Sequence, residues 1–199
     1  VYSRIGEVYS EQMNFNGALE YYRNAYGAWE KLRNPAFMNN ATLNIANAYS
    51  SLGDNDNAVK YYLQALQAAV QQEDNDMVIA CLSNLGDIYV NEGDYPKALK
   101  AVKEIERTAP DGLSIYQYRV LAKVYYLQHK IDSARYYFNI ASELAEDIRD
   151  DAQLAYLSIQ IELASGNSEE AANSINEYIW LSDSISRMVV SQSATAAEG

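Results

Sequence analysis

The sequence LGDIYVNEGDYPKA, from Leu85 to Ala98, decides the fold because similar stretches recur along the chain. Each copy has a small residue, a tyrosine three positions later, a turn, and a final alanine. The other copies are IGEVYSEQMNFNGA (5–18), IANAYSSLGDNDNA (45–58) and LAKVYYLQHKIDSA (121–134). A degenerate fifth copy ends at Ala171, with Ile159 where the small residue is expected. Self-similarity at intervals of this length is typical of repeat proteins built from stacked supersecondary units.

The small residues occur where two helices of one repeat are expected to approach closely. In the first helix they are Gly6, Ala46, Gly86 and Ala122, and in the second Ala18, Ala58, Ala98, Ala134 and Ala171. The tyrosines of the pattern lie one helical turn beyond the first small residue, so they share its buried stripe. These tyrosines are Tyr9, Tyr49, Tyr89 and Tyr125.

The residues between the two helices of each repeat predict a helix end followed by a new helix start. Glycine suits the left-handed position after a helix, and Asn or Asp suits the N-cap that follows. The glycines are Gly53, Gly93 and Gly166, and the caps are Asn14, Asp54, Asp94 and Asn167. Pro96 then falls in the first turn of the next helix, where its missing N–H is tolerated.

These stretches resemble the tetratricopeptide repeat (TPR) family, whose pattern is large–large–small, Tyr, Gly-Asp/Asn-Tyr and then Ala. The resemblance covers nearly the whole chain. It implies an all-α fold, a right-handed α-α superhelix (TPR solenoid) of about five helix-turn-helix repeats plus a C-terminal capping helix. We expect one solenoid domain over residues 1–190, with repeats at about 1–34, 35–74, 75–110, 113–149 and 151–181, a cap helix at 183–191 and a flexible tail at 191–199.

The C-terminal stretch Tyr178–Ile185 reads Tyr-x-x-Leu-x-Asp-Ser-Ile. It resembles the last repeat of bacterial TPR sensor-regulators of the Bacteroidetes type. Ser182 is expected to cap the final helix, whose Ile185, Met188 and Val189 would cover the end of the stack. Since Val1 falls inside the expected first helix, we also expect the chain to be part of a longer protein.

The net charge and the hydropathy of the chain limit the kinds of molecule that it is expected to bind. The formal net charge is -12, and binding to nucleic acid or anionic membranes needs a basic face. No run of 18 apolar residues is present, so no segment is expected to span a membrane. We therefore expect a protein or peptide partner, neutral or basic, with no nucleic acid and no membrane contact. Solubility alone would also explain the acidity. A homodimer is left open, as is a cytoplasmic or periplasmic location.

The residues that carry catalysis in other proteins are scarce. The single cysteine, Cys81, falls in a helix, and the single histidine, His129, falls in a turn. Neither has a partner placed by the pattern, so we interpret them as a buried small side chain and a solvated turn residue. The stretch Asp54–Asn57 resembles the start of a calcium loop, but Val59 and Ala65 stand where that loop needs Gly and Glu. We predict no enzyme activity, no cofactor and no metal.

The family resemblance implies that the first helix of each repeat lines a concave groove that holds ligands. Carried over, it gives a peptide-binding groove of Asn40, Asn44, Asn47, Asn84, Asp87, Asn91, Tyr116, Arg119, Lys123 and Tyr126. Asparagine carries both a donor and an acceptor and can pair with the backbone of an extended peptide. Arg119 and Lys123, beside Tyr116 and Tyr126, form a basic and aromatic spot suited to a carboxylate. The alternative is that these side chains are simply solvated.

One known ligand mode of the family is not expected here. The clamp that some TPR domains use on chaperone C-termini needs two Lys, one Arg and two Asn. Asn47 and Asn84 match the two asparagines, but Leu43, Tyr116 and Val120 stand where the basic residues should be. The sequence therefore predicts a non-enzymatic interaction scaffold that binds an extended peptide or partner helix. The alternative is the ligand- or partner-sensing domain of a larger bacterial signalling or transcription-regulatory membrane protein.

Overall fold

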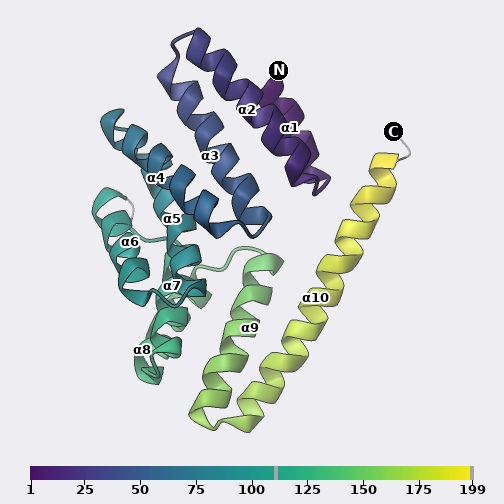
Figure 1. Cartoon of the computed structure of the whole chain (residues 1–199). Coiled ribbons are helices and arrows are strands. Elements are labelled where there is room, and N and C mark those ends of the chain that lie inside the picture. Colours follow the sequence, from purple (N-terminus) through teal and green to yellow (C-terminus); the bar gives the residue numbers. More distant parts are fainter. Residues whose placement is uncertain (110–111, 198–199) are drawn as a thin grey trace. The chain divides into compact units, whose positions relative to one another are not determined.

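The computed structural model describes residues 1–109 and 112–197, and the side chains of these up to residue 188. Throughout this described part the regular elements are α-helices (Figure 1). They are α1 (Tyr2–Glu11), α2 (Phe15–Lys31), α3 (Pro35–Ser51), α4 (Asn55–Gln71), α5 (Asn75–Asn91), α6 (Tyr95–Thr108), α7 (Ile115–Leu127), α8 (Ile131–Glu143), α9 (Ile148–Ser165) and α10 (Ser168–Ala197).

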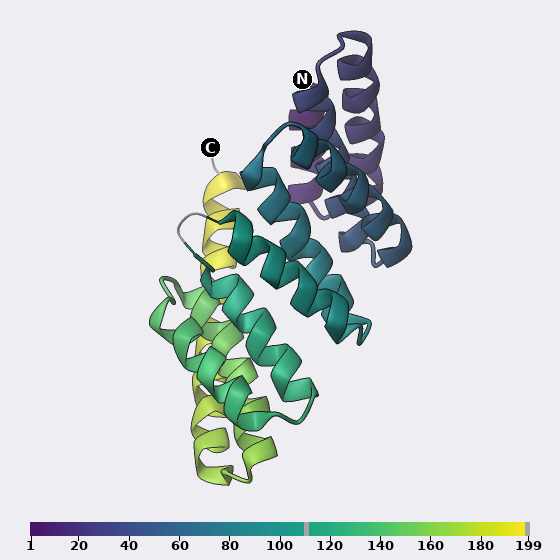
Figure 2. The same ribbon diagram turned by 90° about the vertical axis from the view of Figure 1, so that its left-hand side faces the viewer.

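The helices form successive hairpins, one for each repeat that the sequence predicts. Their contacts divide the chain into two compact units, Val1–Gly112 (unit 1) and Leu113–Gly199 (unit 2). Unit 1 contains the hairpins α1–α2, α3–α4 and α5–α6, and unit 2 contains α7–α8 and α9–α10 (Figure 2). The expected all-α fold of helical hairpins is confirmed.

The small residues of the pattern are buried between the helices, as expected for positions of close approach. The alanines at the end of the pattern, Ala18, Ala58, Ala98, Ala134 and Ala171, are all buried. So are their partners on the first helices, Gly6, Ala46, Gly86 and Ala122. Larger side chains fill the spaces beside them and join one hairpin to the next. In unit 1, for example, Tyr62 of α4 packs with Ala46 of α3 and with Leu85 and Ile88 of α5.

Three of the four tyrosines of the pattern stack on tyrosines twelve residues later in the second helix. The ring centroids lie 5.2 Å apart for Tyr9 and Tyr21, 5.5 Å for Tyr49 and Tyr61, and 5.4 Å for Tyr125 and Tyr137. Stacked aromatic pairs add to the stability gained from burial. The repetition of this pair in three hairpins accounts for part of the unusually high number of tyrosines.

The turns confirm the predicted helix ends and starts. Gly53, Gly93 and Gly166 have φ values of 74°, 78° and 78°, in the left-handed region. Met13 and His129 take the same place in their hairpins with φ of 58° and 59°, a conformation that costs free energy for a residue with a Cβ. The side chains of the predicted caps Asn14, Asp54 and Asp94 each accept a hydrogen bond from the backbone N–H three residues on.

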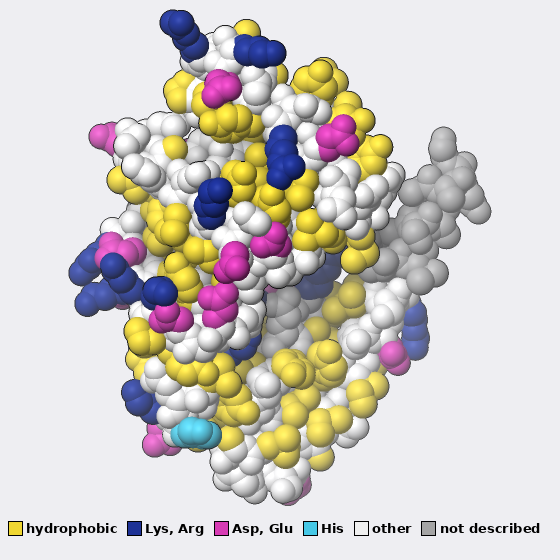
Figure 3. Space-filling view, in the orientation of Figure 1, with side chains coloured by type: hydrophobic (Ala, Val, Ile, Leu, Met, Phe, Trp, Pro, Cys, Tyr) yellow, Lys and Arg dark blue, Asp and Glu magenta, His cyan; other side chains and the backbone are white. Residues whose placement is uncertain are grey.

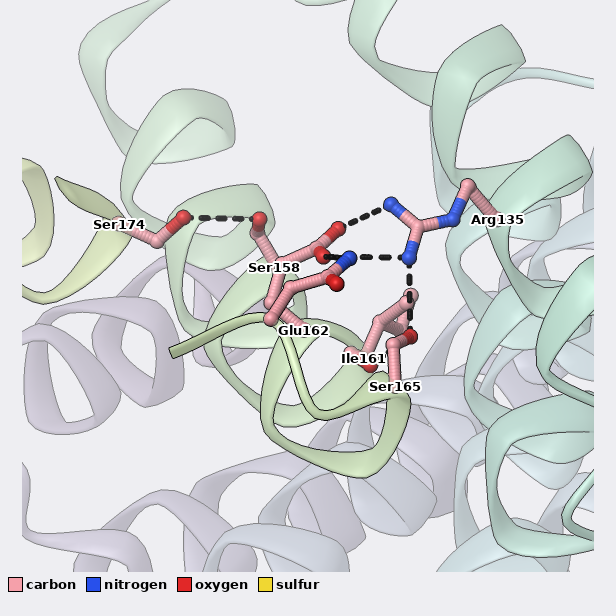
Figure 4. Close-up of polar contacts among 7 residues, drawn as sticks. Arg135, Ser158, Ile161, Glu162, Ser165 and Ser174 are labelled. Carbon is pink, nitrogen blue, oxygen red and sulfur yellow. Dashed lines mark hydrogen bonds and ion pairs between the residues drawn. The ribbon is translucent and has the colours of Figure 1, made fainter. Parts of the chain in front are cut away.

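The fifth repeat replaces the tyrosine of the pattern with Glu162, which binds Arg135 of α8 (Figure 4). Both guanidinium Nη atoms donate to its carboxylate, and Nη2 also donates to Ser165 Oγ at 2.9 Å. Asn167, which directly precedes α10 as predicted, donates from its side chain to Glu162 Oε2 at 2.7 Å. This ion pair joins α8 to α9, and so connects the hairpin α7–α8 to the hairpin α9–α10 within unit 2.

Burial and hydrogen bonding act on Glu162 in opposite directions. Burial alone would raise the pKa of its carboxyl, but hydrogen bonds from Arg135 and Asn167 outweigh it, so the pKa lies below the usual value. A carboxylate with a depressed pKa in the folded state stabilises the fold above the unfolded pKa. That contribution is lost as the pH falls through the folded pKa.

The C-terminal helix differs from the prediction. Residues 183–191 do not form a separate cap, because α10 runs without a break from Ser168 to Ala197. Ser182 is internal, and Ser184 and Ser186 donate to the carbonyls of Trp180 and Ser182 one turn back. No Gly or Pro interrupts this stretch. The expected flexible tail is therefore helical at 191–197, while residues 198–199 lie outside the described part.

Residues of α10 itself cover the end of the stack, in place of a separate cap helix. Leu181 is buried with Ala152 and Ala155 of α9, and Ile185 packs against them as expected. Met188 is 40% exposed, and the Val189 side chain lies outside the described residues. Residues 110 and 111, between the expected third and fourth repeats, also lie outside the described part.

Two glycine substitutions at equivalent positions should have opposite effects on stability. In Gly86→Ala the new Cβ meets only Ala101 at 4.0 Å, and the helix gains about 1 kcal/mol from the higher propensity of alanine. In Gly6→Ala the Cβ would lie 2.5 Å from the Tyr22 ring, and the overpacking should lower the free energy of unfolding by about 1 kcal/mol net. Urea unfolding followed by circular dichroism measures both. Equal effects would contradict the described packing of the two hairpins.

The ion pair of unit 2 should give stability a particular pH dependence. Glu162→Gln should lower the free energy of unfolding near pH 7 by about 1–2 kcal/mol, because a partly buried Arg135 loses its charged partner. The difference from the native chain should shrink as the pH falls below 4.5, the usual glutamate value. The matched control is Glu104→Gln at the exposed pair Arg107–Glu104, where the loss should be below about 0.5 kcal/mol. A pH-independent loss for Glu162→Gln would rule out the electrostatic account.

Candidate functional site

Six of the ten predicted groove residues lie on two helices of unit 1. Their spacing of three and four residues places them on one face of each helix. We call this set the amide face: Asn40, Asn44 and Asn47 on α3, and Asn84, Asp87 and Asn91 on α5. All six side chains are exposed or half-buried. The two helices share the hydrophobic cluster around Tyr62, so both parts of the amide face rest on one core.

Tyr62 holds the amide of Asn47 in one orientation. Its ring is 1% exposed, and its hydroxyl donates to Asn47 Oδ1 at 2.6 Å. Burial raises the pKa of Tyr62, and the negative charge of Asp87 adds to this, so the phenol stays protonated and remains a donor. Because Oδ1 of Asn47 is bound by Tyr62, its Nδ2 points away from Tyr62 and is presented as a donor.

Asn84 is oriented in the opposite sense. Its Nδ2 donates to the carbonyl of Ala80 at 2.8 Å, one turn back on α5. Because the amide nitrogen is bound to a backbone carbonyl of its own helix, the Oδ1 of Asn84 is the atom presented to a ligand, as an acceptor. Asn47 and Asn84 thus offer complementary groups, a donor on α3 and an acceptor on α5.

The other four predicted residues, Tyr116, Arg119, Lys123 and Tyr126, lie on α7 of unit 2. The guanidinium carbon of Arg119 is 5.5 Å from the centroid of the Tyr116 ring. Its Nη1 also lies 3.7 Å from Asp150 Oδ1 of α9. The structure thus joins two of these residues but gives Arg119 a carboxylate from its own chain. A ligand carboxylate at this spot would have to compete with Asp150.

Two residues of the candidate site were not among those predicted. Tyr62 lies on α4, outside the first helices that the resemblance assigns to the groove, and its hydroxyl contact with Asn47 depends on how α3 and α4 pack. Asp150 belongs to an acidic stretch at the start of α9, where acidic residues are common at helix N-termini. Its pairing with Arg119 across two helices leaves no local signal in the sequence.

The residues considered for catalysis have other environments. Cys81 is fully buried, and burial raises the pKa of its thiol to about 12, so it is not a thiolate near neutral pH. His129 is exposed in the turn between α7 and α8. Within the described residues no group of three or more His, Cys, Asp or Glu side chains is arranged to hold a metal ion. The described helices also include none that is long and apolar enough to cross a membrane.

Comparisons with known proteins identify the repeat. Residues 37–111 match the tetratricopeptide repeat family model. No curated protein sequence matches the chain. BtubC (BKLC) from P. vanneervenii has a similar solved structure, with a TM-score of 0.74 and 21% identity over 93% of this chain and 80% of that one. The putative kinesin light chain repeats of Podosopora anserina give a TM-score of 0.65 and 15% identity, over 94% and 95% of the two chains.

A third similar structure is NprR in complex with its cognate peptide NprX. It gives a TM-score of 0.75 and 19% identity, over 96% of this chain and 57% of NprR. This chain therefore spans little more than half the length of NprR. At these identities the similarities establish the all-α repeat fold and nothing finer.

Removal of the Tyr62 hydroxyl should loosen Asn47 with little damage to the core. Tyr62→Phe keeps the buried ring and should lower the free energy of unfolding by about 1 kcal/mol. The side-chain amide of Asn47 should become more mobile, which 15N relaxation of its NH2 group measures. Asn84, held by Ala80, is the internal reference and should not change. An Asn47 amide that stays as rigid as in the native chain would show that Tyr62 does not orient it.

Proposed function

We propose that this chain, a member of the tetratricopeptide repeat family, is a non-enzymatic scaffold that binds an extended peptide segment of a partner protein on the amide face. The observation that carries the proposal is the fixed orientation of two amides, with Asn47 presenting a donor and Asn84 an acceptor. An extended backbone presents N–H and C=O groups in alternation, so it can pair with both amides whatever its side chains are.

The charge of the chain favours particular partners. The net charge is -12, and Asp87 lies exposed within the amide face. The negative charge of the chain attracts a basic peptide to this face, has little effect on a neutral one and repels an acidic one. On unit 2, Arg119 and Lys123 carry positive charge and are a local exception to the acidic character of the chain. Arg119 is already paired with Asp150.

The surface also suits association with a protein. Large hydrophobic side chains are exposed in both units and appear as yellow areas among the polar ones (Figure 3). Trp180 is 65% exposed and Tyr136 62%. Aromatic side chains are common at protein interfaces because they bury much apolar area on binding. NprR, which has the same fold, is described in complex with a peptide, so the fold is compatible with the proposed type of ligand.

A sensing role within a larger bacterial membrane protein remains the alternative proposal. It rests on the resemblance of Tyr178–Ile185, a stretch that here lies inside α10. In that role the amide face would still bind the ligand or partner, so the two proposals share one site and differ in what the binding controls.

Peptide selection tests the proposed site directly. Peptides selected from a random displayed library against the native chain should bind the double variant Asn47→Ala, Asn84→Ala roughly 10–30-fold more weakly, because two hydrogen bonds are lost. Isothermal titration calorimetry measures the affinities after circular dichroism confirms that the variants are folded. A salt series should show tighter binding of basic than of neutral peptides at low ionic strength.

The matched control removes two exposed asparagines outside the amide face, Asn24→Ala on α2 and Asn139→Ala on α8. This control should bind the selected peptides as the native chain does. Equal affinity for the native chain and for Asn47→Ala, Asn84→Ala would place the binding site elsewhere and remove the basis of the proposal.

A further inference from the structure

One surface of unit 2 carries large apolar side chains that are exposed to solvent. On α9 they are Tyr156 and Leu163, which are 53% and 59% exposed, and on α10 they are Ile175 and Ile179, at 40% and 53%. The rings of Tyr156 and Tyr178 of α10 are in contact, with their centroids 5.7 Å apart. By helical periodicity Leu163 lies on the same side of α9 as Tyr156, and Ile175 and Ile179 lie beside Tyr178 on α10. We call these five residues the end face.

The end face lies on one side of the contact between α9 and α10. Ser158 and Ser174 mark the other side, where their hydroxyls are hydrogen-bonded at 2.9 Å (Figure 4). Two residues are more than half a helical turn, so Ser158 points away from the side of α9 that carries Tyr156. None of the five residues of the end face is charged, although the net charge of the chain is -12. A contiguous apolar surface of this kind is typical of an interaction site.

The repeat shows what covers the equivalent surface of another hairpin. Superposition of the small-residue positions of the pattern aligns the hairpin α9–α10 with α3–α4. The residues equivalent to Tyr156, Ile175 and Ile179 are then Leu43, Tyr62 and Leu66. These three side chains pack in one cluster with Leu85 and Ile88 of α5. The first helix of the following hairpin therefore covers this surface in unit 1.

The hairpin α7–α8 of unit 2 repeats the arrangement. Its Tyr126 and Phe138 are equivalent to Leu163 and Ile175, and both pack against the cluster that contains Ile161 of α9. A helix thus covers the equivalent positions in two hairpins, one in each unit. On the hairpin α9–α10 the same positions are apolar but exposed.

We propose that the end face binds one amphipathic helix of a partner protein, in the position that α5 takes on α3 and α4. Helices that bind in apolar grooves carry apolar side chains three, four and seven residues apart, and Leu85 and Ile88 of α5 have such a spacing. A charge within that stripe would lose its hydration without gaining a partner on the end face. An extended segment turns every second side chain away from the surface, so it does not reproduce the contacts of α5. The end face therefore differs from the amide face in its chemistry and in the conformation of its ligand.

Synthetic peptides based on α5 test the proposal on the full chain. The first has the sequence of Asn75–Asn91 with Cys81→Ser, which prevents oxidation. In methyl spectra of the chain labelled at isoleucine Cδ1, it should shift the signals of Ile175 and Ile179 and leave that of the buried Ile45 in unit 1 unchanged. No shift of Ile175 and Ile179 would overturn the proposal.

Two altered peptides separate the helix from its composition. Leu85→Asp, Ile88→Asp removes the apolar stripe, and Asn84→Pro keeps the stripe but breaks the helix. Neither peptide should shift the signals of Ile175 and Ile179. A shift with the proline peptide equal to that with the unaltered one would show that the end face does not select a helix, and would overturn the proposal.

Variants of the chain locate the binding. Tyr156→Ser, Ile179→Ser removes two exposed apolar side chains and should weaken binding of the α5 peptide roughly 10-fold, because less apolar area is buried on binding. The matched control is Leu32→Ser, Val70→Ser, at residues of unit 1 that are 68% and 60% exposed, and it should bind as the native chain does. Circular dichroism confirms that both variants are folded. Equal weakening by the two variants would overturn the proposal.

Two further measurements distinguish the end face from other sites and from other occupants. The variant Asn47→Ala, Asn84→Ala should bind the α5 peptide as the native chain does, so failure at the amide face and failure at the end face are distinguishable. Sedimentation velocity tests a second copy of the chain as the occupant. A native dimer that becomes a monomer in Tyr156→Ser, Ile179→Ser would show that the chain covers this face itself, and would overturn the proposal of a partner helix.

Discussion

The close contact between paired helices is the constraint on which this structure depends. In the first four hairpins a glycine or alanine of the first helix and an alanine of the second are fully or almost fully buried. Small side chains let the backbones approach, so the larger side chains beside them fill the remaining space at the density of a protein interior. The stacked tyrosines and the bridging Tyr62 occupy positions set by this approach.

The same constraint explains how the amide face is built. Tyr62 reaches between α3 and α5 because Ala46 and Ala58 leave room for its ring, and its hydroxyl then meets Asn47. A core residue thus fixes the orientation of a surface amide. Groups held in place before binding lose less conformational freedom when a partner arrives. The repeat therefore supplies both the fold and the ordered polar groups on its surface.

Much of this could be predicted from the sequence because the repeat depends on local spacing. The small residues, the turn glycines and the caps at Asn14, Asp54 and Asp94 were all correctly assigned. Contacts between hairpins could not be predicted in this way. The ion pairs of Glu162 with Arg135 and of Arg119 with Asp150 are examples. The end of the chain was also misjudged, since Ser182 is a good cap residue but no breaker precedes it, and α10 continues.

The proposed binding mode places an extended peptide against the oriented amides of α3 and α5. A crystal structure of the chain with a selected peptide would show whether the peptide lies there. We expect a peptide carbonyl within hydrogen-bond distance of Asn47 Nδ2 and a peptide N–H donating to Asn84 Oδ1, with the Tyr62 contact to Asn47 retained. A peptide bound with no contact to either amide, or an Asn47 turned away from Tyr62 in the complex, would contradict it.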